Sequence, residues 1–232
     1  MVHIFMIDSS ALSRHGLLSA LGEYPEFQVV GDAANVSEAL IKLGELQPDI
    51  VITDIFMPSG GGVDDITRLR QAFPNIKVLI FTVSNNKDDV FKSIMAGACG
   101  YMMKTAELTE VIESIRLVAS GNAIVFPLMT ARVLTQLKNT NWQSINGFKS
   151  LSPNEKETLV LVAQGATNRE IAEHCQVSET MVKARLTRIM DKLNAKNRTQ
   201  AVALATARGL LNSYNQNNEM KSDLRQQAFS QP

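Results

Sequence analysis

Apolar and polar positions along residues 1–120 predict strands and helices in strict alternation. Short apolar runs rich in β-branched residues indicate five strands: Val2–Ile7, Phe27–Val30, Ile50–Thr53, Ile76–Val83 and Gly100–Met103. Amphipathic stretches indicate five helices: Ala11–Leu21, Ser37–Leu46, Val63–Ala72, Lys87–Ala96 and Glu107–Ala119. Strands that are apolar throughout belong to a sheet covered on both faces. The pattern therefore predicts an α/β doubly wound domain with a five-stranded parallel sheet.

Residues 151–211 show a different pattern, because four short helical segments replace the alternation of strands and helices. A side chain suited to capping a helix precedes three of them: Ser152, Thr167 and Ser178. In the first two, a glutamate three residues later completes a capping box. The third helix should end near Leu193, and the fourth should cover Thr199–Leu211. Only Gln176-Val177 joins the second and third helices, so we predict an all-α four-helix domain with a helix-turn-helix.

Composition divides the chain into four parts. The α/β domain is expected over residues 1–120 and the helix-turn-helix domain over residues 151–211. Residues 121–150 should form a linker, with one helix near Leu128–Leu137 and a polar remainder. Residues 212–232 are rich in Asn, Gln and Ser and lack a periodic apolar face, which predicts a disordered tail.

No segment has the run of about 20 apolar residues that a membrane-spanning helix needs, and the N-terminus lacks the features of a signal peptide. We therefore expect a cytoplasmic protein without a membrane partner. The two cysteines, Cys99 and Cys175, fit a reducing compartment, and their spacing does not suit a metal site.

The net charge of zero hides an asymmetry along the chain. Residues 1–120 carry nine basic and fifteen acidic side chains, a net charge of −6, whereas residues 178–198 carry six basic and two acidic ones, a net charge of +4. This contrast indicates different partners for the two halves. A positive charge alone would fit a solvated helix face as well as a binding surface. The arrangement of the basic residues on the helix distinguishes the two interpretations.

The predicted helix that begins after Ser178 has one apolar stripe and one polar, basic side. The stripe must face the domain core and consists of Val182, Leu186, Ile189 and Leu193. A helix whose outer side carries small and basic residues fits the major groove of DNA. Our candidates for base or phosphate contact on this side are Lys183, Ala184, Arg185, Thr187 and Arg188. Our candidates for contact with backbone phosphates alone are Lys192, Lys196 and Arg198.

The same region resembles the LuxR/NarL-type DNA-binding domain. The matching segments are Leu151-Ser-Pro-Asn-Glu, Gly165-Ala-Thr-Asn-Arg-Glu-Ile-Ala and Val177-Ser-Glu-Thr-Met-Val-Lys-Ala-Arg, followed by Lys192-Leu and Asn197-Arg. The resemblance implies that Lys183 contacts double-stranded DNA and that the last helix pairs two subunits into a homodimer. Family members usually have histidine where this chain has Arg185, which changes the polar flank of the reading helix.

Four residues with charged or reactive side chains stand at the ends of predicted strands: Asp8, Asp54, Thr82 and Lys104. In doubly wound sheets, ligands and chemistry collect at the carboxyl ends of the strands. We therefore expect two carboxylates, a hydroxyl and an ammonium group to converge on one edge of the sheet.

These residues lie in segments that resemble a response-regulator receiver domain: Asp8, Asp54-Ile-Phe-Met-Pro-Ser-Gly-Gly-Gly, Phe81-Thr-Val-Ser and Ala96-Gly-Ala-Cys-Gly-Tyr-Met-Met-Lys. The resemblance implies that a sensor histidine kinase transfers a phosphoryl group to Asp54. Mg²⁺ bound by Asp8 and Asp54, together with Lys104, would stabilise the charge of that group. Thr82 would move toward the phosphoryl group, and Tyr101 would then fill the vacated space as a switch.

Position 9 departs from this resemblance. Family members usually carry two acidic residues at the end of the first strand, whereas this chain has Asp8-Ser9. A hydroxyl is a poorer ligand for Mg²⁺ than a carboxylate, so metal binding should be weaker. One alternative is therefore a regulator that works without phosphorylation and whose receiver serves dimerisation or ligand binding. We do not expect an enzyme, since a phosphatase using Asp54 would leave the basic helix-turn-helix without a purpose.

Taken together, the two domains resemble a NarL/FixJ-type response regulator from end to end. The resemblance implies a cytoplasmic transcription regulator of a two-component system that binds DNA as a homodimer and acts with RNA polymerase. Phosphorylation of Asp54 would control it.

Overall fold

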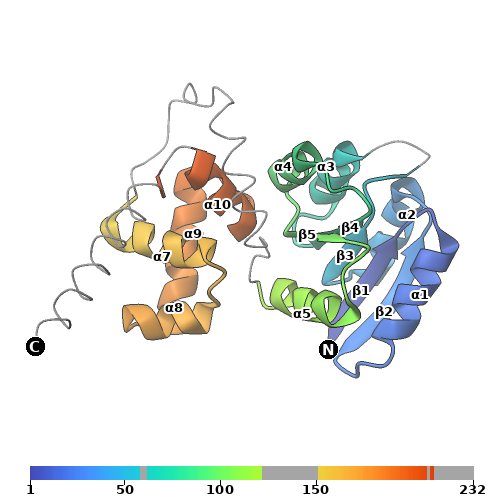
Figure 1. The fold of residues 1–232 in the computed structure, drawn as a ribbon, viewed down its shortest axis with the longest axis horizontal. Helices are drawn as coiled ribbons and strands as arrows, with labels where there is room; N and C mark the ends of the chain where they lie inside the picture. The colour runs from blue at the N-terminus through green and yellow to red at the C-terminus, as the bar shows by residue number, and fades with distance from the viewer. Residues whose placement is uncertain (58–61, 122–150, 208–209, 212–232) are drawn as a thin grey trace, which may run out of the picture. The chain divides into compact units, whose positions relative to one another are not determined.

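The computed structural model describes residues 1–57, 62–121, 151–207 and 210–211, which form two compact units, one built on a sheet and one entirely helical (Figure 1). Nearly all of the predicted linker, residues 122–150, and the whole predicted tail, residues 212–232, lie outside the described residues. No helix in the described ranges is long and apolar enough to cross a membrane. The cytoplasmic location stays a prediction.

The first unit contains the predicted five-stranded parallel sheet, with strand order β2-β1-β3-β4-β5. Its strands are β1 Val2–Ile7, β2 Phe27–Ala33, β3 Ile50–Thr53, β4 Lys77–Thr82 and β5 Gly100–Met103. Its helices are α1 Ala11–Leu21, α2 Val36–Leu46, α3 Val63–Ala72, α4 Lys87–Ala96 and α5 Leu108–Ala119. The strand order reverses direction beside β1, so a crevice for ligands is expected at the carboxyl ends of β1 and β3.

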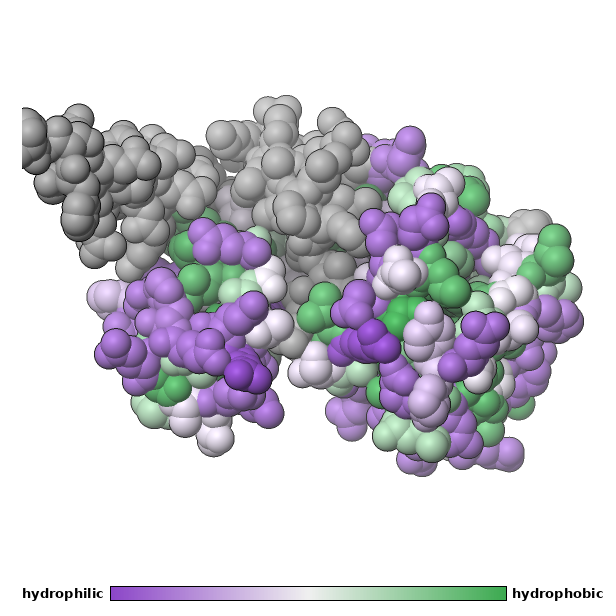
Figure 2. Space-filling model, turned by 60° about the horizontal axis from the view of Figure 1, so that its bottom comes forward, coloured by the Kyte–Doolittle hydropathy of each residue, from purple (hydrophilic) through white to green (hydrophobic). Residues whose placement is uncertain are grey.

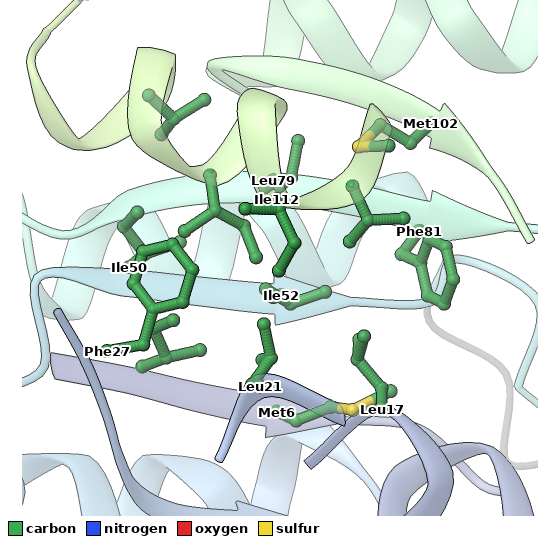
Figure 3. Close-up of a cluster of buried hydrophobic side chains, with 14 residues drawn as sticks. Met6, Leu17, Leu21, Phe27, Ile50, Ile52, Leu79, Phe81, Met102 and Ile112 are labelled. Atoms are coloured by element: carbon green, nitrogen blue, oxygen red, sulfur yellow. The ribbon is translucent and has the colours of Figure 1, made fainter. Parts of the chain in front are cut away.

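The sheet is covered on both faces, as its apolar strands predict. One face packs against α1 and α5 through a cluster that Figure 3 shows, with Ile50, Ile52 and Leu79 on the strands and Leu17 and Ile112 on the helices. Burial of each such aliphatic side chain contributes about 1.5–3 kcal/mol. The result is a rigid platform whose carboxyl edge holds the candidate site.

Several element boundaries differ from the sequence-based prediction: α2 and α5 start one residue away from the predicted position, β4 starts at Lys77, and α10 covers Arg198–Ala207 in place of Thr199–Leu211. Strand β2 extends three residues beyond Val30, because the register shifts between Ile4 and Phe5 and lets the chain pair with β1 as far as Ala33. Strand β4 ends at Thr82, one residue earlier than predicted. The polar Asp32 in β2 interrupts the apolar run, so hydrophobic pattern alone places the end of that strand too early.

The second unit contains α7 Pro153–Ala163, α8 Asn168–Cys175, α9 Glu179–Leu193 and, from Ala201 onward, α10 Arg198–Ala207. Both predicted capping boxes are formed, one by Ser152 with Glu155 and one by Thr167 with Glu170. The turn between α8 and α9 contains Gln176, whose φ of 54° is left-handed. This geometry ends α8 and allows α9 to start at once, which completes the helix-turn-helix.

Candidate functional site

The carboxyl edge of the sheet brings three of the predicted residues together. Asp8 follows β1, Asp54 follows β3 and Lys104 follows β5. The ammonium nitrogen of Lys104 lies 2.5 Å from Asp8 Oδ2 and 2.6 Å from Asp54 Oδ2. The two carboxylate side chains are only 1% and 4% exposed, so each needs this counter-charge. Partial burial lowers the pKa of Lys104, but hydrogen bonds to Asp54 and Asp8 outweigh that effect and raise it above its ordinary value.

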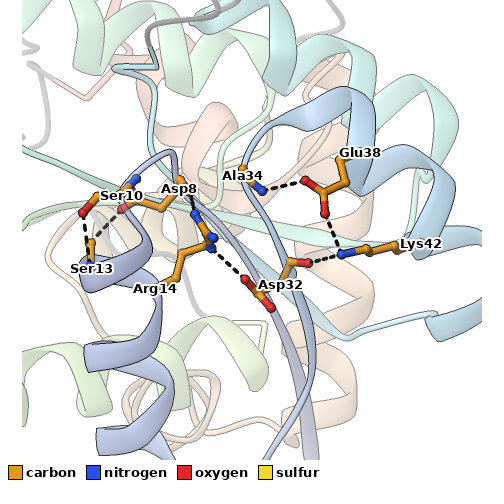
Figure 4. A network of polar contacts seen from close by, with 8 residues as sticks. All are labelled: Asp8, Ser10, Ser13, Arg14, Asp32, Ala34, Glu38 and Lys42. Carbon is orange, nitrogen blue, oxygen red and sulfur yellow. Dashed lines mark hydrogen bonds and ion pairs between the residues drawn. The ribbon is translucent and has the colours of Figure 1, made fainter.

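Asp8 is held in place by the beginning of α1 (Figure 4). Its Oδ1 accepts a hydrogen bond from the Ser10 amide at 2.8 Å, and its Oδ2 accepts one from Ser13 Oγ at 2.8 Å. Arg14 donates to the Asp8 carbonyl oxygen at 2.5 Å and to Asp32 Oδ2 at 2.6 Å. Ser13 was not singled out in the sequence, although its position in the first turn of the predicted helix after Asp8 is a usable signal.

Asp54 has a simpler environment. Its Oδ1 accepts a hydrogen bond from the Phe56 amide at 2.8 Å, and its own amide donates to the Ile7 carbonyl at 3.0 Å. The bond to Ile7 connects the residue to β1, and the bond from Phe56 fixes the orientation of the carboxylate. Asp54 is therefore a rigid carboxylate beside a cation, which is an arrangement suited to attack on phosphorus.

Thr82 and Tyr101 are linked to each other through Ser84. Thr82 is fully buried, and its hydroxyl oxygen accepts a long 3.4 Å bond from the Ser84 amide. The Tyr101 hydroxyl donates to the Ser84 carbonyl at 2.9 Å, and the side chain is 1% exposed. Burial raises the pKa of Tyr101 to about 12. The resemblance predicts that Tyr101 turns inward only after Thr82 moves, whereas the side chain already points inward in the structure.

The side chains at this edge of the sheet limit how Mg²⁺ could be bound. The described residues contain no group of three or more His, Cys, Asp or Glu side chains that could hold a metal ion. Ser9 is exposed, and only Asp8 and Asp54 provide carboxylates. Because Mg²⁺ is often held by one or two carboxylates together with water and phosphate oxygens, the pair fits a weak site.

The second candidate site is the outer side of α9. The predicted apolar stripe is confirmed, since Val182, Leu186, Ile189 and Leu193 are all buried. Of the predicted DNA contacts on this helix, four are exposed: Lys183, Ala184, Thr187 and Arg188. Met181, which the sequence analysis did not single out, is 52% exposed beside them. Figure 2 shows a largely hydrophilic surface on the visible face of the helical unit.

The other predicted DNA contacts have different surroundings. Arg185 Nη1 donates to Thr158 Oγ1 at 2.9 Å, and Lys192 Nζ lies 2.7 Å from Glu155 Oε2, so both side chains reach α7. Lys196 is exposed in the segment after α9. Arg198 is the first residue of α10 and is buried, which lowers its pKa to about 10.

Comparisons with known proteins agree with this architecture. Residues 4–116 match the response regulator receiver domain, and residues 149–205 match the bacterial regulatory proteins of the luxR family. The DNA-binding transcriptional activator DevR/DosR of Mycobacterium tuberculosis is 30% identical over 206 residues, which is 89% of this chain and 94% of that protein. The transcriptional regulatory protein LiaR of Bacillus subtilis is 30% identical over 212 residues, which is 91% of this chain and 100% of that protein.

A solved structure shows the same relationship. The LuxR-family two-component response regulator from an Aurantimonas species is 27% identical, with a TM-score of 0.55, over 59% of this chain and 97% of that one. Sequence and structure thus agree, and the chain belongs to the response regulators that join a receiver domain to a luxR-type DNA-binding domain.

Proposed function

We propose that this protein is a DNA-binding transcriptional regulator of a two-component system, controlled by phosphorylation of Asp54. The observation that carries the proposal is the contact of Lys104 with both buried carboxylates at the carboxyl edge of the sheet. The domain limits proposed from the sequence, residues 1–120 and 151–211, assign the control site and the DNA-binding site to separate parts of the chain.

The proposed reaction is transfer of a phosphoryl group from a phosphohistidine of a sensor kinase. An oxygen of Asp54 attacks phosphorus and forms the acyl phosphate, while the phosphorus–nitrogen bond of the donor breaks with its electron pair going to nitrogen. The imidazole leaves as the neutral ring, because its other nitrogen already carries a proton. Lys104 lies where its charge would stabilise the oxygens of the transferred group. Mg²⁺, held by Asp8 and Asp54, would neutralise further negative charge on these oxygens.

The geometry around Thr82 suggests how the phosphoryl group would be sensed. Among the described residues, no acceptor is found for the Thr82 hydroxyl proton, so it can donate to a phosphoryl oxygen at Asp54. A shift of Thr82 would be passed to Ser84, whose carbonyl oxygen holds the Tyr101 hydroxyl. The switch we propose is therefore the chain Thr82–Ser84–Tyr101 rather than a free rotation of Tyr101.

On the DNA side, the exposed residues of α9 are the proposed major-groove contacts. Lys183 and Arg188 supply charge and hydrogen-bond donors, and the neighbouring Met181 is suited to apolar contact with a thymine methyl group. Lys196 and Arg198 stay proposals for phosphate contact, and so does Lys192, although its ammonium group is paired with Glu155 within the domain. Binding as a homodimer and cooperation with RNA polymerase belong to the same proposal.

Incubation of the full chain with acetyl phosphate and Mg²⁺, followed by intact mass measurement, tests the control by Asp54. We expect the mass of one phosphoryl group on the wild type and none on Asp54→Asn. DNA binding of the same samples, measured by gel shift, should increase only where the mass increases. An unmodified wild type that binds DNA fully would instead support the phosphorylation-independent regulator that Ser9 suggests.

A further inference from the structure

Arg185 lies on the flank of α9 that faces α7, not on the exposed side that carries Lys183. Its Nη1 donates to Thr158 Oγ1 at 2.9 Å and approaches the Asn154 carbonyl oxygen at 3.4 Å. We infer that Arg185 is a positioning residue that fixes the DNA-reading helix against α7 and does not itself contact DNA. This inference rests on the proposed DNA-binding function.

Thr158 is well suited to anchor this contact. Its side chain is fully buried in α7, and its hydroxyl donates to the Asn154 carbonyl at 2.9 Å while it accepts from Arg185. Both hydrogen-bonding functions of the hydroxyl are therefore used. A hydrogen bond from a guanidinium to a buried oxygen is stronger than one between neutral, exposed groups.

A second tie lies on the same flank of α9. Lys192 follows Arg185 by seven residues, about two helical turns, and its ammonium group bonds to the buried Glu155 on α7. Two contacts separated along one helix restrain both its rotation about its axis and its tilt. Arg185 holds the N-terminal half of α9, which also carries Lys183 and Ala184.

The consequence for DNA recognition follows from this geometry. Base edges are read through hydrogen bonds with strict distance and angle limits, so a small rotation of α9 moves Lys183 and Arg188 away from their partners. Attraction to phosphates tolerates such a rotation, because it depends mainly on charge. Loss of the Arg185–Thr158 contact should therefore lower sequence-specific binding more than non-specific binding.

The test uses the full chain and two DNA duplexes: one recovered by the wild type from a random-sequence pool, and a shuffled duplex of the same composition. Affinities are measured over a range of KCl concentrations for Arg185→Ala, Thr158→Val, the double variant and Thr158→Ser. We expect each of the first two to bind the recovered duplex about tenfold more weakly. The double variant should be no weaker than the weaker single variant, and Thr158→Ser should bind like the wild type.

The salt dependence separates positioning from contact. A lost phosphate contact lowers the slope of log K against log [KCl] by about one, which is expected for Lys183→Ala, whereas Arg185→Ala and Thr158→Val should keep the wild-type slope. Binding to the shuffled duplex depends mainly on phosphate contacts, which both variants keep. Their affinity for this duplex should therefore change by less than about twofold.

Several outcomes would overturn the inference. A reduced slope for Arg185→Ala, or wild-type binding by Thr158→Val, would make Arg185 a DNA contact. Additive losses in the double variant would do the same. If circular dichroism shows that Thr158→Val does not fold, the salt slope and the sequence specificity of Arg185→Ala still distinguish a positioning residue from a DNA contact. A wild type that recovers no duplex from the pool would refute the proposed function itself, which is a distinguishable result.

Discussion

At the edge of the sheet, Lys104 is paired with two carboxylates that are almost completely buried, whereas Lys183 on α9 is exposed and has no salt bridge among the described residues. In the proposed reaction, the first cation is held where it would stabilise the charge of the transferred phosphoryl group. The second is left available to a partner outside the chain. The comparison teaches that the partners of a basic side chain, more than its place in a motif, indicate what it does.

The helical unit contains both kinds of cation side by side. Lys192 is paired with the buried Glu155, and Arg185 is bonded to Thr158, although both belong to the same basic helix as Lys183. Variants at each kind of residue can therefore break or sharpen the comparison.

The largest effect is expected for Lys104→Ala. The substitution removes the only counter-charge seen within hydrogen-bond distance of Asp54 in the described residues. Loss of one such electrostatic stabiliser typically slows a reaction by about 100-fold or more. We expect the rate of phosphorylation of Asp54 by acetyl phosphate, followed by intact mass, to fall by about that factor.

The matched control is Lys92→Ala, which removes an exposed lysine of α4. Its phosphorylation rate should equal that of the wild type. A rate for Lys104→Ala within about twofold of the control is roughly the scatter of surface variants. Such a rate would show that Lys104 is structural and does not act in the reaction.

The next effect concerns the buried pair of the helical unit. Burial raises the pKa of Glu155, but bonds from Lys192 and Ser152 outweigh it and hold the pKa below its ordinary value. A lowered pKa stabilises the fold above the ordinary pKa, and the stabilisation is lost as the pH falls through the lowered value. Glu155→Gln should therefore lower the free energy of unfolding by about 3 kcal/mol at neutral pH, and the difference from wild type should shrink below about pH 4.5.

Native-state hydrogen exchange at the amides of α7 and α9 measures this difference within the helical unit alone. Glu173→Gln is the control, because Glu173 pairs with Arg169 on an exposed surface and such pairs contribute little. Equal, pH-independent losses in the two variants would contradict a special role for the buried pair.

A smaller effect is expected for Lys183→Ala. Loss of one phosphate or base contact should weaken DNA binding about tenfold and lower the salt slope by about one. Fluorescence anisotropy with the recovered duplex measures both quantities. Lys42→Ala removes a lysine of α2 that is paired with Glu38, and its binding should match the wild type. A wild-type slope for Lys183→Ala would mean that an exposed position on α9 is not enough to identify a contact.

The sequence predicts much of this architecture, because local patterns determine it. All five strands and the four helices of the second unit follow from apolar periodicity and capping residues, and Ser152 with Glu155 forms the predicted box. The convergence of Asp8, Asp54 and Lys104 follows from the rule that strand ends share an edge.

The partners of individual side chains could not be predicted in the same way. Arg185 meets Thr158 across 27 positions of the chain, and no periodicity reports such a contact. Ser84 was missed for a similar reason, since it acquires its role only when folding places its carbonyl oxygen beside Tyr101. Positions and local capping pairs were predictable, whereas pairings between distant residues required the packed structure.

The smallest effect is expected for Tyr101→Phe, which removes the hydroxyl that bonds to the Ser84 carbonyl and keeps the ring. One such bond contributes about 1 kcal/mol to the free energy of unfolding. Burial raises the pKa of Tyr101 to about 12. The protonated hydroxyl therefore stabilises the fold fully below the ordinary pKa of tyrosine, and this stabilisation is lost as the pH rises through about 12. Urea unfolding of Tyr101→Phe at neutral pH should show this loss, with Tyr24→Phe, another ring-preserving change in the same unit, as the control.

The same variant decides how the two halves of the comparison are connected. Tyr101 makes no hydrogen bond to Asp54 or Lys104 among the described residues, so Tyr101→Phe should accept a phosphoryl group at the wild-type rate. If the chain Thr82–Ser84–Tyr101 carries the signal, phosphorylation should no longer increase the affinity of the variant for DNA. A slower phosphorylation with an intact DNA response would place Tyr101 in the reaction instead, and a normal response in both assays would exclude its hydroxyl from the switch.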